Sequence, residues 1–175
     1  MLFSSLEFLY LFLPVSLILY FAVPWRAKNP LLLALSLLFY AGGEPVFVLL
    51  MMFTIAVDYA LGLAVGRRVT SGTEAEKKKA GRLLLLGLVY NLGVLALFKY
   101  TSPLFSTLAP IFGKTASAMP QLPLPIGISF YTFQALSYLI DVFRSRVRAQ
   151  KSLVAFGVYI SLFPQLIAGP IVRYS

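Results

Sequence analysis

Six long apolar runs constrain this chain more than any other feature. They cover residues 6–23, 30–41, 45–65, 83–98, 124–143 and 153–172. Four of them reach the length of about 17 residues at which a helix crosses a bilayer core. The run 83–98 is borderline, and the run 30–41, which would rise only about 18 Å as a helix, must tilt or thin the bilayer to span. With only 12% charged residues, the chain cannot cover a water-facing surface. The runs predict an all-α polytopic membrane protein with about six transmembrane helices.

The basic residues divide unevenly between the two ends of these runs. If all six runs span, 12 of the 15 lie on one side, and Lys99, Lys114 and Arg173 lie on the other. Because cytoplasmic loops are enriched in Lys and Arg, we expect the basic side to be cytoplasmic and the N-terminus to be outside. The sequence therefore predicts a multi-pass plasma-membrane protein in a lipid bilayer, with residues 67–82 as a cytoplasmic basic loop. Topology alone explains this basic cluster, so we expect no nucleic-acid partner.

Five prolines from Pro103 to Pro125 set apart residues 99–123. A continuous spanning helix is not expected across them, because proline removes a backbone donor and clashes with the preceding turn. Ser102 and Pro103 resemble an N-cap followed by the first helical residue, and an apolar stripe continues to Phe112. We predict an extracytoplasmic loop over 99–123 that contains a short interfacial helix.

Two polar residues lie deep inside neighbouring apolar runs. Asp58 lies eight residues before Gly66, and Asn91 lies nine residues after Arg82. Because the two runs are antiparallel, the rise of a helix places both residues at similar depth, about 12 to 13 Å from the same end. We predict that Asp58 and Asn91 are hydrogen-bonded. Such a pair can join two helices or bind a substrate group, and helix packing is the simpler interpretation.

The fifth run carries its polar groups on one helical face. This face is expected to meet the protein interior or a polar cavity; it comprises Gly127, Phe130, Tyr131, Gln134, Ser137, Tyr138 and Asp141. The opposite side is expected to meet lipid or apolar protein, and comprises Ile128, Phe133, Leu136, Leu139 and Ile140. At the end of the run, Asp141 is predicted to pair with Arg144 one turn later, in a structural rather than catalytic role.

The sixth run is interrupted twice, at residues 163–165 (FPQ) and 168–170 (AGP). Within a membrane, a broken helix is tolerated only where protein or a water-lined cavity satisfies the freed backbone groups. Gln165 and this backbone therefore indicate either a cavity wall or helix-packing kinks. The chain has no histidine and no cysteine, the commonest general base and a common metal ligand, so we predict no catalytic residue and no metal site in it.

Several of these stretches resemble the membrane-bound O-acyltransferase family, and in particular its alginate O-acetyltransferase membrane-subunit branch. The resemblance extends over essentially the whole chain. Its residues are 124–134 (LPIGISFYTFQ), 138–144 (YLIDVFR), 163–174 (FPQLIAGPIVRY), and the shorter segments 1–5 (MLFSS), 39–41 (FYA) and 98–100 (FKY).

The resemblance implies that residues 1–175 form the N-terminal part of a single membrane domain. Such enzymes pass an acyl group, usually acetyl, from a cytoplasmic donor toward a cell-envelope polysaccharide. The donor would be acetyl-CoA or another activated acyl carrier, acting as a substrate, with no bound cofactor. The family's catalytic histidine is expected in a later part of the sequence, so this fragment alone is expected to be inactive.

The resemblance also suggests which residues line a cavity and which partner completes the reaction. Ser129, Tyr131, Gln134 and Gln165 are the candidate cavity liners, although the family often has histidine where Gln165 stands. An extracytoplasmic partner with a serine-hydrolase-like fold is implied. The alternative is a non-enzymatic transporter or flippase subunit for an envelope polymer, with a substrate site at the broken sixth helix. We find no clear inverted repeat, which disfavours this alternative.

Overall fold

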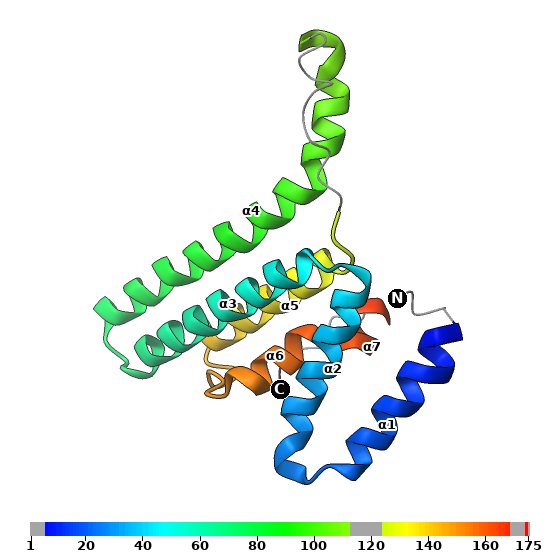
Figure 1. Cartoon of the computed structure of the whole chain (residues 1–175). Coiled ribbons are helices and arrows are strands. Elements are labelled where there is room, and N and C mark those ends of the chain that lie inside the picture. Colours follow the sequence, from blue (N-terminus) through cyan, green and yellow to red (C-terminus); the bar gives the residue numbers. More distant parts are fainter. Residues whose placement is uncertain (1–5, 113–123, 169–173, 175) are drawn as a thin grey trace.

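The computed structural model describes residues 6–112, 124–168 and 174, and every regular element in them is helical (Figure 1). The predicted all-α class is confirmed. Within the described residues, each of the six apolar runs contains a helix or a broken helix. In chain order the elements are the π-helix η1 (Phe8–Phe12), α1 (Leu13–Ala22), the 3-10 turn η2 (Trp25–Ala27), α2 (Lys28–Gly43), α3 (Phe47–Thr70), α4 (Glu74–Phe112), α5 (Ile128–Phe143), α6 (Leu153–Ser161) and α7 (Phe163–Ala168).

Helix α5 lies at the centre of the bundle and packs against α3, α4 and α6. Ten of its residues are buried, including Tyr131 and Tyr138 on its polar face. Leu136 and Leu139 on the opposite side are also buried, so that side meets apolar protein.

Phe130 is a correction to the face predicted for α5. We expected it to point inward, but it is 40% exposed, next to Phe133 at 43%. Residues three apart lie close together around a helix, so the two rings form a single outward stripe. The other sides of α5 are enclosed by neighbouring helices.

Helices α3 and α4 form an antiparallel pair joined by a very short connection. The prediction of a basic loop over 67–82 was wrong in conformation, because α3 continues to Thr70 and α4 begins at Glu74. Glu74 and Glu76 occupy the first turn of α4, where negative charge favours the helix dipole, and each contacts a lysine three residues later. These local charges support a helix that extends beyond the apolar run.

The prediction of a separate helix beginning at Ser102 was also wrong. Helix α4 continues through Ser102 and Pro103 to Phe112. Figure 1 shows that α4 changes direction in its C-terminal third. Pro103 lies in this third, and it removes one backbone hydrogen bond, which bends a helix when neighbouring turns still hold. The remainder of the predicted loop, residues 113–123, lies outside the described residues.

Two helices are long and apolar enough to cross a membrane, α3 (Phe47–Thr70) and residues Glu74–Thr101 of α4. Their most apolar windows are only 39% and 17% buried within the chain. Large apolar side chains of α4 remain exposed, among them Leu85, Leu86, Val89, Leu92 and Leu97. A continuous apolar surface of this kind requires lipid or further protein to cover it. The structure therefore shows two helices able to span and does not by itself show six.

A cluster of four phenylalanines connects the N-terminal helices to the broken helix α6–α7. Phe8 and Phe12 from η1, Phe39 from α2 and Phe163 from α7 have ring centroids 5.2–6.0 Å apart. Offset and edge-to-face packing of this kind contributes beyond the area that it buries. The cluster positions the break between α6 and α7 against α2.

Candidate functional site

Asp58 of α3 and Asn91 of α4 form a buried hydrogen bond, as predicted. The Asn91 side-chain amide donates to Asp58 Oδ1 at 2.7 Å and also to the Gly87 carbonyl at 3.0 Å. The two residues are 0% and 1% exposed. A second polar contact lies one turn away, where the hydroxyls of Thr54 and Tyr90 are 3.2 Å apart. These contacts form a polar seam between two apolar helices, which matches the helix-packing interpretation.

Two residues on the polar face of α5 fix the position of α6 and of the linker before it. Gln134 Nε2 donates to the Tyr159 carbonyl of α6 at 2.6 Å. Tyr138 Oη accepts from the backbone N–H of Gln150 at 2.9 Å. Tyr131 lies on the same face and is fully buried, and within the described residues its hydroxyl has no hydrogen-bond partner. The predicted inward orientation of Tyr131, Gln134 and Asp141 is confirmed by their burial.

The predicted pair between Asp141 and Arg144 is replaced by one between Asp141 and Arg146. Asp141 Oδ1 lies 3.7 Å from Arg146 Nη1, and the Asp141 carbonyl accepts from the Arg146 backbone N–H at 2.9 Å. Arg144 is the exposed C-cap of α5. Ser145 then adopts a positive φ of 58°, which reverses the chain and returns Arg146 over the helix end.

The start of α5 depends on Gly127. This residue is the N-cap and has φ of 76°, a conformation that favours glycine. A Cβ atom at Gly127 would lie 3.3 Å from Leu166 Cδ2 of α7. The preceding carbonyl, of Ile126, accepts from the Tyr40 hydroxyl of α2 at 3.0 Å. Helices α2 and α7 therefore both anchor the polar helix at its first turn.

The predicted interruption of the sixth run is confirmed at its first position. Leu162 separates α6 from α7, and Pro164 is the second residue of α7. The Phe163 backbone N–H donates to Ser36 Oγ of α2 at 3.4 Å, so protein satisfies this freed group. Gln165 is half-buried, and its Nε2 has no hydrogen-bond partner within the described residues. The second predicted break includes residues 169–170, which lie outside the described residues.

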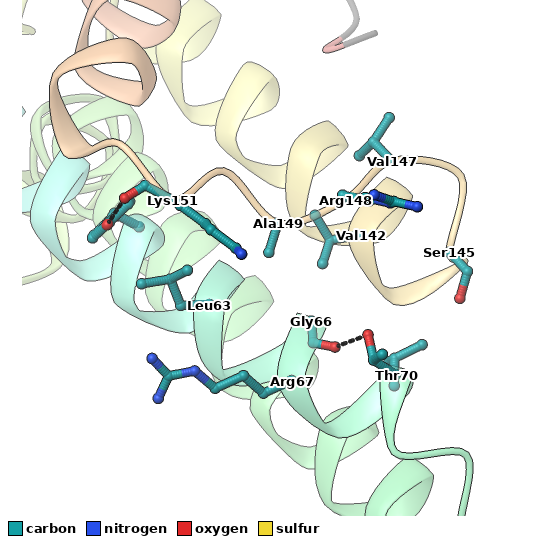
Figure 2. A pocket seen from close by; sticks show the side chains of 12 residues that line it. Leu63, Gly66, Arg67, Thr70, Val142, Ser145, Val147, Arg148, Ala149 and Lys151 are labelled. Atoms are coloured by element: carbon teal, nitrogen blue, oxygen red, sulfur yellow. Dashed lines mark hydrogen bonds between the residues drawn. The ribbon is translucent and has the colours of Figure 1, made fainter.

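Two clefts open beside the linker between α5 and α6. The first, of about 1030 Å³, lies between the C-terminal half of α3 and this linker, as Figure 2 shows. Its lining includes Tyr59, Leu63, Gly66, Arg67, Thr70, Val142, Ser145, Arg148, Ala149 and Lys151. The second, of about 770 Å³, is lined by Asp141, Tyr174 and the residues 146–151.

None of the four predicted cavity liners borders either cleft. Ser129 is half-buried in the first turn of α5, whereas Tyr131 and Gln134 lie in the core. Their role as cavity liners stays a prediction. Sequence reasoning treated Arg67, Arg148 and Lys151 only as topology signals and so did not identify the clefts. Arg67 follows the run 45–65, and Arg148 and Lys151 follow the run 124–143. This placement was the feature of the sequence that could have indicated the clefts.

No group of three or more carboxylate, histidine or cysteine side chains that could hold a metal ion occurs within residues 6–112, 124–168 and 174.

Comparison with known proteins gives matches over the whole chain. It is 41% identical over 178 residues to a Pseudomonas aeruginosa protein named probable alginate O-acetylase AlgI, covering 100% of this chain and 33% of the relative. A protein of the same name from Azotobacter vinelandii is 41% identical over 177 residues, with 99% and 34% covered. A Helicobacter pylori protein named peptidoglycan O-acetyltransferase is 33% identical over 205 residues, with 100% and 37% covered.

The chain spans about a third of the length of these curated relatives. No family model matches it, and no solved structure matches it significantly. The relatives named for alginate and for peptidoglycan nevertheless align with all or nearly all of the chain, including the stretches whose resemblance was noted above. Over its full length, the chain is therefore similar to proteins named as O-acetyltransferases of two envelope polymers, which is consistent with a fragment of a membrane-bound O-acyltransferase.

Proposed function

We propose that the whole protein transfers O-acetyl groups to a polysaccharide of the cell envelope, and that this chain forms part of its membrane domain. The observation that carries the proposal is identity of 33–41% over the full chain to relatives named as O-acetyltransferases of two different envelope polymers. The 175 residues contain no histidine, so the family's reactive histidine is proposed to lie outside them. By themselves, these residues are proposed to be inactive.

The proposed contribution of this chain is one wall of the cavity in which transfer occurs. Tyr131 and Gln165 support it, because each has a buried donor without a partner in the described residues. A buried donor of this kind requires an acceptor from elsewhere, such as a substrate, water or another part of the protein. Ser129 and Gln134 lie on the same helix as Tyr131. We assign all four residues to the cavity wall on this basis.

The proposed arrangement in the membrane has six spans, an extracytoplasmic N-terminus and a cytoplasmic basic side. Two observations support it: the described part of every apolar run contains a helix, and basic residues lie at the joined ends of α3 and α4. Helix α2 has 16 residues, about 24 Å, and would span only with local thinning of the bilayer. The protein is assigned to the plasma membrane, in contact with the lipid bilayer.

The proposed donor and acceptor steps occur on opposite sides of this membrane. Acetyl-CoA or another activated acyl carrier would deliver the acetyl group from the cytoplasm. An extracytoplasmic partner with a serine-hydrolase-like fold would pass it to the polysaccharide. The acyl donor is a substrate in this scheme.

Deletion of the gene in its host tests the proposal. Ester-linked acetate in the purified envelope polysaccharides is expected to fall, while the amount of each polymer stays the same. A restored wild-type gene should return the acetate, and a copy with the proposed histidine replaced by alanine should not. Unchanged acetate in the deletion strain would contradict the proposal. Loss of the polymer from the cell surface would support the transporter alternative.

A further inference from the structure

The first cleft is lined by three basic residues and no acidic residue. The nearby acids Glu74, Glu76 and Asp141 each contact a cation that does not line this cleft. Their partners are Lys77 for Glu74, Lys79 and Arg68 for Glu76, and Arg146 for Asp141. Within the described residues, no ion pair involves Arg67, Arg148 or Lys151. The cleft therefore holds uncompensated positive charge, which attracts an anion.

Two of these cations, Arg67 of α3 and Lys151 of the linker between α5 and α6, lie on segments that a hydrogen bond joins. Arg67 follows Tyr59 and Leu63 at intervals of four residues, so the three residues lie along one face of α3. Across the cleft, the Lys151 carbonyl accepts from the Tyr59 hydroxyl at 2.6 Å. Figure 2 shows Arg67 and Lys151 on the same side of Ala149 as Leu63, with Arg148 on the other side. Arg67 and Lys151 thus both line one compartment, with Arg67 near the end of α3 and the Lys151 backbone beside Tyr59.

The floor between these cations is apolar and continues along a membrane-spanning helix. Leu63 is half-buried and lies between Tyr59 and Arg67 on α3. The linker rests directly on α3 at Gly66, where an added Cβ would lie only 2.6 Å from Ala149 Cβ. This contact closes the compartment on one side. The compartment therefore has one cation near the end of α3, a second cation on the linker and an apolar wall between them, which suits a ligand that is both anionic and hydrophobic.

We propose that the compartment formed by Tyr59, Leu63, Arg67 and Lys151 binds the phosphate headgroup of an anionic phospholipid. Arg67 and Lys151 contact the phosphate, and an acyl chain follows the Leu63 side of α3. Basic pockets between helices on the cytoplasmic side are typical sites for such headgroups. A small soluble phosphate would contact Arg67 and Lys151 but would leave the apolar wall at Leu63 uncovered, whereas a phospholipid would cover both. The cleft volume of about 1030 Å³ is sufficient for a headgroup and the first part of its chains.

Native mass spectrometry of the gene-encoded protein in detergent tests this site. The probes are phosphatidylglycerol and, as a lipid without net charge, phosphatidylcholine with the same acyl chains. The double variant Arg67→Gln/Lys151→Gln is expected to lose phosphatidylglycerol affinity by about 25-fold, from the loss of two cations at a membrane surface. The matched variant Lys77→Gln/Lys79→Gln removes two charges at the same end but outside the cleft, and should stay within about twofold of wild type.

Each remaining outcome decides the proposal. Unchanged binding in the cleft variant, or an equal loss in both double variants, would overturn a specific site. Tighter binding of inorganic phosphate or coenzyme A than of phosphatidylglycerol to the wild type, lost in the cleft variant, would assign the cations to a soluble phosphate and overturn the lipid proposal. If the double variant does not fold, the single variants Arg67→Gln and Lys151→Gln should each bind about fivefold more weakly. Wild-type affinity in both would overturn it.

Discussion

The side-chain amide of Asn91 donates to the Asp58 carboxylate across 2.7 Å and joins α3 to α4 inside their apolar stretch. Both side chains are buried, at 1% and 0% exposure. Such a bond stabilises a helix pair mainly because neither partner can turn to water.

Replacement of only one partner of this bond is expected to destabilise the protein more than replacement of both. Asp58→Leu leaves one of the two Asn91 amide donors without its acceptor, at a cost of about 1–3 kcal/mol, while the bond to the Gly87 carbonyl remains. The double variant Asp58→Leu/Asn91→Leu should recover at least half of this loss, because no buried polar group remains unpaired. Unfolding in detergent, followed by circular dichroism, measures both. Additive losses in the double variant would contradict the assigned coupling.

Substitution of Gly127 by alanine should destabilise the start of α5. Alanine at φ of 76° is strained by about 1–2 kcal/mol, and its Cβ would press on Leu166. Gly93→Ala is the matched control, because an added Cβ there meets nothing within 4 Å. The control should be neutral or stabilising by about 0.5–1 kcal/mol. Equal melting temperatures for the two variants would argue against a strained cap at Gly127.

Helix α3 approaches α5 at Gly62, where little space remains. A Cβ at this position would lie 2.6 Å from Cε1 of Tyr138, whose hydroxyl accepts from the Gln150 N–H. We expect Gly62→Ala to cost about 1–3 kcal/mol through overpacking. Gly81→Ala, with the nearest ring atom 4.0 Å away, should cost less than half of that. Hydrogen exchange at Gln150 provides a local readout, and unchanged protection there would show that Tyr138 has not moved.

Arg146 and Arg144 should differ in their effect on the end of α5. Arg146 contacts Asp141, whose side chain is only 10% exposed. Arg146→Gln should therefore lower stability by up to about 1 kcal/mol, as is typical of a pair with one exposed member. Arg144→Gln should have no measurable effect, because its side chain is exposed and makes no ion pair within the described residues. Denaturation at low and at 1 M salt measures both, and a larger loss for Arg144→Gln would contradict the assignment.

The proposed topology can be tested with single cysteines, because these 175 residues contain none. Ser71→Cys lies in the connection between α3 and α4, and Glu44→Cys lies before α3. In intact cells, a membrane-impermeant maleimide should label Glu44→Cys and leave Ser71→Cys unlabelled until the cells are permeabilised. Any cysteine elsewhere in the gene product is first replaced by serine. Labelling of both, or of Ser71→Cys alone, would contradict an extracytoplasmic N-terminus.

Residue spacing predicted the features that depend on one helix or on two helices of known direction. The Asp58–Asn91 bond followed from the constant rise of a helix, and the interruption after α6 followed from Pro164. The same reasoning failed for Phe130, because a single period cannot show how many sides of a helix are enclosed. It also failed at Ser102 and Pro103, where α4 bends and continues.

The pairing of Asp141 shows where local sequence rules stop. Spacing of three residues suggested Arg144, which would have been correct in a longer helix. The helix instead ends at Phe143, and Ser145 reverses the chain at φ of 58°, so that Arg146 returns to the carboxylate. After this reversal the linker packs against α3 at Gly66, a contact between distant parts of the sequence.

The sequence by itself determined that the chain is a helical membrane protein, because long apolar runs in a bilayer must satisfy their backbone hydrogen bonds internally. It also determined the depth of the buried polar pair and the family resemblance. Only the tertiary structure decided which arginine meets Asp141 and where a basic cleft forms. Arg67 and Lys151 both line this cleft. No local preference brings residues so distant in sequence together, and only the packing of α5 and its linker against α3 does so.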